Sequence, residues 1–249
     1  MSDRDIGRKE FERESLDYFL DAYGYANDIR LKYGPLASDF VCRTPTGEFV
    51  GIDIIKEAKP ALPPDAQRLH FLSATPFRYA SRPPAGSRFR QREDSGVLYG
   101  AEDVPTACAE AGYWRLRFWL DSEGLRARPT SLPMTLFEFH GGATQAALDL
   151  TKPPLVARRE DWIQPDDYRA SQALAAEARE IPAELIRYES VRDGPDGRCL
   201  AILAPWVFRA VREAYQHNQQ CWSLFLQPPG LTVWQRELDG TNFEFRFGT

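Results

Sequence analysis

The chain has 249 residues, of which 43% are hydrophobic and 27% charged, and its formal net charge at pH 7 is −5. This composition argues against a disordered protein, because so many apolar residues can form a substantial core, in one large domain or in a domain plus an extension. The negative net charge argues against direct binding of nucleic acid, whose phosphates require a basic surface.

The N-terminal part is predicted to contain a helix over residues 8–32, followed by one or two strands over residues 37–64. The helix is indicated by apolar side chains at helical spacings: Phe11, Leu16, Phe19, Leu20 and Tyr23. A Gly-Pro pair ends this pattern, and a proline-rich stretch closes the second segment. We therefore place a domain boundary near residue 70, between an N-terminal extension (1–70) and the main domain (71–249).

Two short strands and an arginine-rich loop are predicted next. We expect the strands over residues 77–80 and 97–99, with a loop rich in proline, glycine and arginine over residues 81–95. Arginines gather here in an otherwise acidic chain, namely Arg78, Arg82, Arg88, Arg90 and Arg92. Their planar guanidinium forks suit the recognition of phosphate.

A helix is predicted to begin after Asp103. The carboxylate of this residue can cap the helix, and Pro105 fits its first turn. Residues 114–120 are compatible with a helix or with a strand, because their apolar members also alternate with Arg115 and Arg117. The sequence therefore leaves the end of this helix open.

The rest of the chain mixes helices and strands. Helices are predicted over residues 167–179 and 205–218. Strands are predicted over residues 134–139, 148–151, 183–188, 199–203, 222–226, 231–235 and 243–247. Because the elements do not follow a regular strand–helix–strand alternation, the predicted fold class is α+β.

Cysteines, histidines and apolar runs argue against several classes of protein. The four cysteines contain no Cys-x-x-Cys pair, which is typical of reduced thiols in a cytoplasm. The three histidines stand apart, so no metal site is expected. No apolar run approaches the roughly 20 residues of a membrane-spanning helix, and the charged N-terminus does not fit a signal peptide. We therefore expect a cytoplasmic protein without membrane contact.

Four polar side chains that suit dinucleotide chemistry are spaced along the chain: Arg88, Tyr99, Glu110 and Ser190. A guanidinium can hold phosphate through paired charge-assisted bonds, and a carboxylate can stabilise positive charge at an anomeric carbon. Glu110 stands among alanines, a cysteine and a glycine, so nothing bulky screens it from a ligand. Each residue also has an ordinary interpretation: a solvated loop arginine, a half-buried strand tyrosine, a helix-face glutamate and a serine that caps a turn.

The order and spacing of these residues resemble the RES family, named for its Arg, Glu and Ser. The segment Gly86-Ser87-Arg88-Phe89 is similar to a Gly-Gly-Arg-Trp-like motif of the family, with serine in place of the second glycine. The family's Tyr-x-Ser-x-Arg pattern and following glycine turn are matched by Tyr188, Ser190, Arg192 and Gly197. The resemblance covers roughly residues 71–210, and residues 1–70 match no family that we recognise.

The resemblance implies an ADP-ribosyltransferase-like fold, in which a mixed β core with flanking helices surrounds an NAD cleft. It implies a toxin of a type II toxin–antitoxin system that cleaves the nicotinamide–ribose bond of NAD, its co-substrate, without a metal. ADP-ribose would then pass to a protein, phosphate or water. The expected catalytic residues are Arg88, Tyr99, Glu110 and Ser190. The expected dinucleotide-binding residues are Arg78, Arg88, Tyr99, Ser190 and Arg192.

Ser190 is expected to bond the nicotinamide ribose or its amide, because no histidine stands near it to complete a nucleophilic triad. The resemblance also implies a small helix-turn-helix, Xre-like antitoxin as partner, and the arginines around residues 82–92 are its predicted contact. The alternative is a non-catalytic module that senses a nucleotide or docks a partner through the same cleft. A general glycosidase is disfavoured, because no second carboxylate is placed to serve as partner of Glu110.

Overall fold

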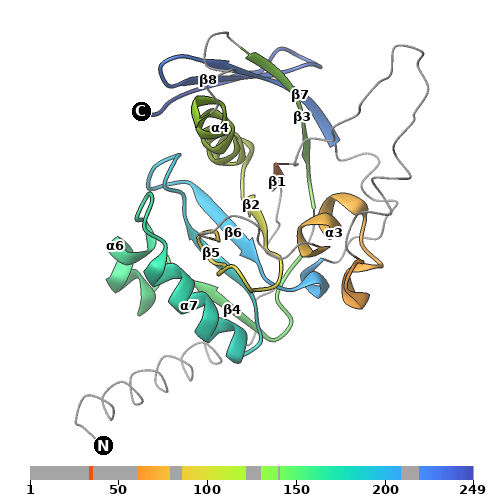
Figure 1. The fold of residues 1–249 in the computed structure, drawn as a ribbon, viewed down its shortest axis with the longest axis vertical. Coiled ribbons are helices and arrows are strands. Elements are labelled where there is room, and N and C mark those ends of the chain that lie inside the picture. The colour runs from red at the N-terminus through yellow and green to blue at the C-terminus, as the bar shows by residue number, and fades with distance from the viewer. Residues whose placement is uncertain are drawn as a thin grey trace, which may run out of the picture.

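Two β-sheets and a long helix between them form the frame of the molecule (Figure 1). The computed structural model describes residues 34–35, 61–78, 86–121, 130–139, 141–208 and 219–248. Within these ranges, helices and strands occur together without a repeated strand–helix–strand alternation, so the predicted α+β class is confirmed.

The first sheet has the strand order β1-β3-β7-β8-β9 and is antiparallel throughout. Its strands are β1 (Gly34–Pro35), β3 (Thr130–Phe137), β7 (Gln219–Gln227), β8 (Leu231–Arg236) and β9 (Asn242–Arg246). Alternate residues of β7 and β8 are buried, among them Trp222, Leu224 and Trp234. This period of two arises because one face of the sheet packs against the long helix.

The second sheet has the strand order β2-β6-β5-β4. Its strands are β2 (Leu98–Ala101), β4 (Ala146–Asp149), β5 (Ala183–Glu189) and β6 (Arg198–Ile202), and only β4 and β5 pair in parallel. The sheet separates two apolar cores: Ile186 and Ala201 belong to one, whereas their neighbours Leu185 and Leu200 belong to the other. Both faces are therefore covered, which explains the nearly continuous apolar runs of β5 and β6.

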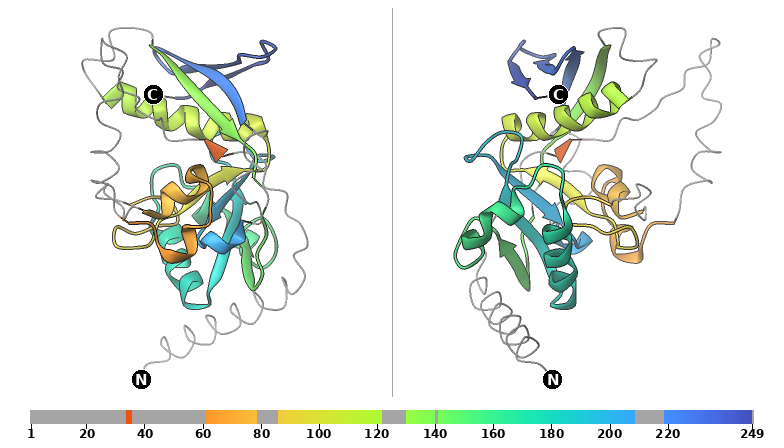
Figure 2. Two further views of the ribbon diagram at one scale, coloured as in Figure 1. Left: turned by 90° about the vertical axis from the view of Figure 1, so that its right-hand side faces the viewer. Right: turned by 60° about the vertical axis from the view of Figure 1, so that its left-hand side comes forward.

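The long helix α4 (Val104–Asp121) lies between the two sheets (Figure 2). The predicted cap is confirmed, because a carboxylate oxygen of Asp103 accepts the backbone N–H of Thr106 at 2.8 Å. Small residues allow the helix to approach both sheets. A methyl group at Gly112 would lie only 3.0 Å from Nε1 of Trp234 on β8. The segment over residues 114–120, compatible with either element in the sequence, is helical.

The other helices cover the second sheet. They are α3 (Phe71–Arg78), α6 (Arg159–Trp162) and α7 (Arg169–Glu180), together with the 3-10 turns η1 (Pro64–Ala66), η2 (Leu155–Arg158) and η3 (Pro205–Val207). Residues of α7 pack into the core shared with α4, and residues of α3 pack into the other core. No helix in the described part of the chain is long and apolar enough to cross a membrane.

The strand predicted over residues 77–80 is wrong, because residues 71–78 form helix α3 and Arg78 is its last residue. The buried side chains Ala74 and Phe77 are three residues apart, which is helical spacing. Their packing in the core with Phe139 and Phe208 outweighs the strand preference of the aromatic residue.

The remaining predicted elements agree with the structure in type. The seven strands of the C-terminal half, the strand near residue 98 and the helix over 167–179 are confirmed, with ends shifted by up to a few residues. Of the helix predicted over 205–218, residues 205–207 form η3, and 209–218 lie outside the described residues. The predicted helix over 8–32 and almost all of the segment over 37–64 also lie outside them.

We expect the substitution Leu224→Ala to lower the free energy of unfolding by about 2–5 kcal/mol, because it leaves a cavity in a fully packed core. Leu224 is 0% exposed between the first sheet and α4. The measurement is urea denaturation followed by circular dichroism. The matched control is Leu238→Ala, which alters a residue that is 82% exposed and should change stability by less than about 0.5 kcal/mol. Equal effects of the two substitutions would contradict this packing.

Candidate functional site

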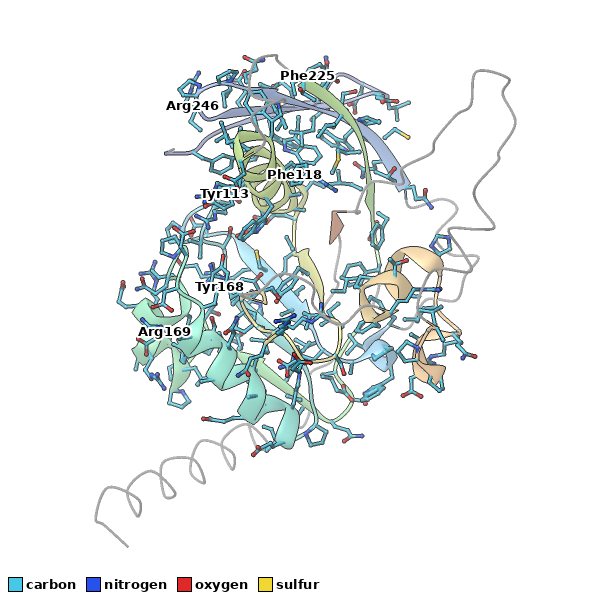
Figure 3. The ribbon with its side chains drawn as sticks, viewed as in Figure 1. Tyr113, Phe118, Tyr168, Arg169, Phe225 and Arg246 are labelled. Atoms are coloured by element: carbon cyan, nitrogen blue, oxygen red, sulfur yellow. The ribbon has the colours of Figure 1, made fainter. Side chains whose placement is uncertain are left out.

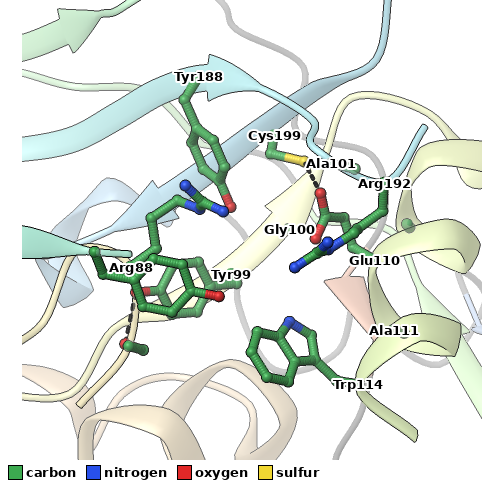
Figure 4. Close-up of a pocket in the computed structure, with 13 residues that line it drawn as sticks. Arg88, Tyr99, Gly100, Ala101, Glu110, Ala111, Trp114, Tyr188, Arg192 and Cys199 are labelled. Carbon is green, nitrogen blue, oxygen red and sulfur yellow. Dashed lines mark hydrogen bonds between the residues drawn. The ribbon is translucent and has the colours of Figure 1, made fainter. Parts of the chain in front are cut away.

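A cavity of about 170 Å³ opens between α4 and the second sheet. Its walls come from the turn over residues 87–88, strand β2, residues 107–114 of α4, the segment before α7 and the β5–β6 hairpin. The side chains of Arg88, Glu110 and Arg192 point into it (Figure 4). The pocket thus brings together residues that are more than a hundred positions apart in the sequence.

Glu110 is held in the pocket through one of its two carboxylate oxygens. Its Oε1 accepts the hydroxyl of Ser190 at 2.7 Å, the backbone N–H of Val191 at 3.2 Å and the thiol of Cys199 at 3.8 Å. None of the described residues forms a hydrogen bond with the second oxygen, Oε2. Its neighbours Ala107 and Ala111, which also line the pocket, are small. One oxygen is therefore fixed, and the other is available to a ligand.

Ser190 lies behind Glu110 rather than in the wall of the pocket. Its hydroxyl donates to Glu110 and accepts the backbone N–H groups of Arg192 and Asp193 at 3.2 and 3.0 Å. One donor and two lone pairs are all that a serine hydroxyl has. Since the side chain is also 1% exposed, the predicted direct contact of Ser190 with a ligand is not favoured by this geometry.

Arg88 is presented by a tight turn. Gly86 has φ +70°, and a methyl group there would collide with the carbonyl oxygen of Arg90, so this position requires glycine. Ser87, which stands where the family motif has its second glycine, shares a hydrogen bond of 2.8 Å with the hydroxyl of Tyr99. The serine therefore makes a hydrogen bond that a glycine could not make. Arg88 lines the pocket although the motif has serine in place of its second glycine.

Tyr99 fastens this turn to strand β2. Its hydroxyl also accepts the backbone N–H of Phe89 at 3.0 Å, while its ring lines the pocket. Burial raises the pKa of Tyr99, although hydrogen bonds from Ser87 and Phe89 act in the opposite direction. The phenol therefore stays protonated near neutral pH. Its hydroxyl holds the turn of Arg88, which leaves the ring face as the part that can meet a ligand.

The two arginines of the pocket are held by the same segment, residues 162–168. Arg88 donates to the carbonyl oxygen of Trp162 at 2.7 Å, and Arg192 donates to that of Pro165 at 2.8 Å. Each guanidinium also stacks on an aromatic ring: Arg88 on Tyr168, at 4.7 Å from the ring centre, and Arg192 on Tyr113, at 3.4 Å. Figure 3 marks Tyr113 on α4 and Tyr168 at the start of α7.

Carbonyl groups and rings fix the two guanidiniums without cancelling their charge. Among the described residues, the ion pair of Arg192 is a long one, to Asp166 at 4.0 Å, and no ion pair of Arg88 occurs. Their positive charge therefore remains available to an anionic ligand.

Burial keeps two further groups of the pocket neutral. Desolvation, followed by the nearby Cys199 and Glu110, raises the pKa of Tyr188 well above its ordinary value. Desolvation and Glu110 likewise raise the pKa of the Cys199 thiol. Near neutral pH both groups are protonated, and Glu110 is the only acid among the described residues that line the pocket.

Of the residues selected from the sequence, Arg88, Tyr99, Glu110 and Arg192 line the pocket. Arg78 does not line it, since it is the last residue of helix α3 and not part of the strand predicted over residues 77–80. No group of three or more His, Cys, Asp or Glu side chains in the described ranges is arranged to hold a metal ion.

Four further residues of the pocket wall were not predicted as site residues from the sequence: Trp114, Tyr168, Tyr188 and Cys199. Trp114 had a usable signal, because in a continuous helix it lies four residues after Glu110 and thus on the same face. Tyr188 was quoted only as part of a pattern match, and Tyr168 lies at the start of the helix predicted over residues 167–179. Cys199 gave no signal, since its place depends on the pairing of β6 with β5 and β2.

We expect the substitution Tyr99→Phe to lower the free energy of unfolding by about 1–3 kcal/mol, because the N–H of the fully buried Phe89 loses its acceptor. Amide hydrogen exchange of Phe89 should become faster in the same variant. The control is Tyr168→Phe, whose hydroxyl makes only an exposed bond to Pro165. Unchanged exchange at Phe89 in Tyr99→Phe would show that the phenol does not hold this turn.

Comparison with known proteins identifies the family of this chain. The RES domain family matches residues 63–224. A solved structure, the M. tuberculosis MbcT–MbcA toxin–antitoxin complex, contains a chain that is similar at 17% identity with a TM-score of 0.45, over 86% of this chain and 93% of that chain. No curated protein matches the chain. Since the family match extends over more than half of the sequence and includes the whole pocket, the protein belongs to the RES domain family.

Proposed function

We propose that this protein is an enzyme that consumes NAD, by breaking the bond between nicotinamide and ribose and passing ADP-ribose to an acceptor. The observation that carries the proposal is the carboxylate of Glu110, of which one oxygen is held by hydrogen bonds and the other is open to a ligand. The same pocket contains two guanidiniums. Flat aromatic side chains beside guanidinium groups suit a ligand made of rings and phosphates. Membership of the RES family supports the same chemistry.

A single carboxylate suffices for this reaction because of the charge of the leaving group. The nicotinamide of NAD is a pyridinium cation and departs as a neutral ring, so no general acid has to protonate it. The positive charge moves onto the ribose, where a fixed carboxylate stabilises the oxocarbenium-like transition state. A glycosidase with paired acids is poorly supported, since the described residues of the pocket wall include only one acid.

The other residues divide into those that would touch the substrate and those that position them. Arg88 and Arg192 would bind the pyrophosphate or ribose hydroxyls. The half-exposed indole of Trp114 offers a stacking face for one of the two bases. Ser190 and Tyr99 would be positioning residues. The hydroxyl of Ser190 holds Glu110, and the hydroxyl of Tyr99 holds the turn of Arg88.

We further propose that the protein is the toxin of a type II toxin–antitoxin pair. Cleavage of NAD removes a molecule that all growing cells require, and the resemblance to the RES family implies this role. The proposed partner is a helix-turn-helix, Xre-like antitoxin that covers the pocket. The alternative is a module that binds a nucleotide in the same pocket without cleaving it.

We expect the substitution Glu110→Gln to slow the release of nicotinamide from NAD by about 10²- to 10³-fold, because the amide keeps the shape of the side chain but not its charge. The measurement is chromatography of nicotinamide after incubation of the purified protein with NAD. The control is Glu180→Gln, at an exposed position outside the pocket, which should leave the rate unchanged. Undiminished release by Glu110→Gln would refute the role of this carboxylate, and NAD binding without release by the unmodified protein would favour the sensing module.

Expression of the unmodified protein in a bacterial host should stop growth and lower cellular NAD, because the reaction consumes the dinucleotide. Expression of Glu110→Gln should do neither, whereas Glu180→Gln should act like the unmodified protein. Colony counts and mass spectrometry of NAD and its products measure the two effects. Growth arrest by Glu110→Gln at a normal NAD level would contradict the proposal that toxicity comes from NAD cleavage.

A further inference from the structure

Glu110 and Ser190 come from separate elements that must stay in register. Glu110 lies on the second turn of α4, and Ser190 directly follows strand β5. A hydrogen bond of 2.7 Å joins the two side chains, and the backbone N–H of Val191 and the thiol of Cys199 bond the same carboxylate oxygen. All three bonds act at one residue of α4, so the orientation of the helix also depends on an attachment at a second point.

The second attachment is a hydrogen bond between Thr106 and Asp193. The hydroxyl of Thr106 donates to Oδ2 of Asp193 at 2.6 Å. Thr106 precedes Glu110 by four residues and therefore lies on the same face of the helix. Asp193 follows Ser190 by three residues, and its backbone N–H bonds the hydroxyl of Ser190 at 3.0 Å. Two residues of the helix thus form hydrogen bonds with two residues of one turn.

The bond of Thr106 is short and partly buried. Thr106 is 0% exposed, and an O–H donor with an ionised acceptor makes a stronger hydrogen bond than a neutral pair. The backbone of the same residue is held by the cap Asp103 at 2.8 Å. The cap moves with the helix, so rotation of α4 about its axis would break the bond of Thr106 to Asp193 and the bond of Glu110 to Ser190.

Gly197 provides the space for this arrangement. Its carbonyl oxygen accepts the N–H of Ser190 at 2.9 Å, which closes the turn. A methyl group at position 197 would lie 2.9 Å from Cβ of Ser190 and 3.1 Å from Oγ1 of Thr106. A larger residue would push the helix and the turn apart.

We propose that Thr106 and Asp193 are positioning residues, which hold α4 against the β5–β6 turn so that the carboxylate of Glu110 faces the pocket. This inference rests on the proposed NAD-cleaving function of Glu110. It assigns two residues outside the pocket wall to the reaction, through their effect on the placement of one charge.

The test is the rate of nicotinamide release by Thr106→Val, which keeps the shape of the side chain and removes the hydroxyl. We expect kcat to fall by about 10- to 100-fold with KM for NAD unchanged, because a misplaced catalytic group loses rate rather than binding. Thr106→Ser should restore the rate, because it keeps the hydroxyl. Asp193→Ala removes the acceptor of the same bond and should lower kcat as Thr106→Val does. Because Asp193 lies in a partly exposed turn, an equal loss of kcat in this variant would show that the loss does not come from misfolding of the helix variant.

A matched control exists elsewhere in the fold. The hydroxyl of Thr144 donates to the carboxylate of Glu184 at 2.7 Å, which is the same kind of bond outside the pocket. Thr144→Val should therefore leave kcat unchanged, whatever its effect on the melting temperature. In addition, Thr106→Val should not slow the Glu110→Gln protein any further, since the charge that the bond positions is already absent.

The outcomes separate this inference from the proposed function. No nicotinamide release by the unmodified protein would refute the proposed function and the inference together. Release by the unmodified protein and by Thr106→Val at the same kcat would refute only the positioning role. A further loss of kcat when Thr106→Val is added to Glu110→Gln would also refute it, because the effect would then be independent of the carboxylate.

Discussion

The hydrogen bond between Ser190 and Glu110 is the contact on which the rest of the site depends. It crosses from the helix that fills the space between the sheets to the hairpin of the second sheet, and it fixes one oxygen of a pocket carboxylate. A carboxylate in a partly closed pocket is stable only if hydrogen-bond donors replace the water that it loses. Ser190, Val191 and Cys199 supply those donors on one side, which leaves the other oxygen to the ligand.

The two guanidiniums of the pocket, unlike the carboxylate, are held mainly by uncharged groups. Arg88 and Arg192 are held mainly by backbone carbonyls of residues 162–168 and by tyrosine rings, so the guanidiniums are oriented without being neutralised. By contrast, Arg187 is enclosed by the carboxylates of Glu102 and Asp149. An arginine with two acid partners stabilises the sheet, whereas an arginine held by neutral groups keeps its charge for a ligand.

The sequence predicted most elements of the fold, because strand alternation and helix capping are local signals. It also predicted four residues of the pocket wall, since Arg88, Tyr99, Glu110 and Arg192 stood in recognisable motifs. The strand predicted over residues 77–80 was wrong, because the packing of α3 overrode a local strand pattern. The partner of the Ser190 hydroxyl could not be predicted, because it depends on which carboxylate the folded chain places beside it.

Burial of Cys199 bears on the identity of the nucleophile. A thiol beside the anomeric carbon could in principle accept ADP-ribose, but only as a thiolate. Desolvation and the charge of Glu110 raise the pKa of this thiol well above its ordinary value, and its proton points to Oε1 of Glu110. Tyr188 stays neutral for the same reasons. Neither side chain therefore offers an anionic acceptor for ADP-ribose in the proposed reaction, and the only acid of the described pocket wall is Glu110, which would stabilise the ribose cation.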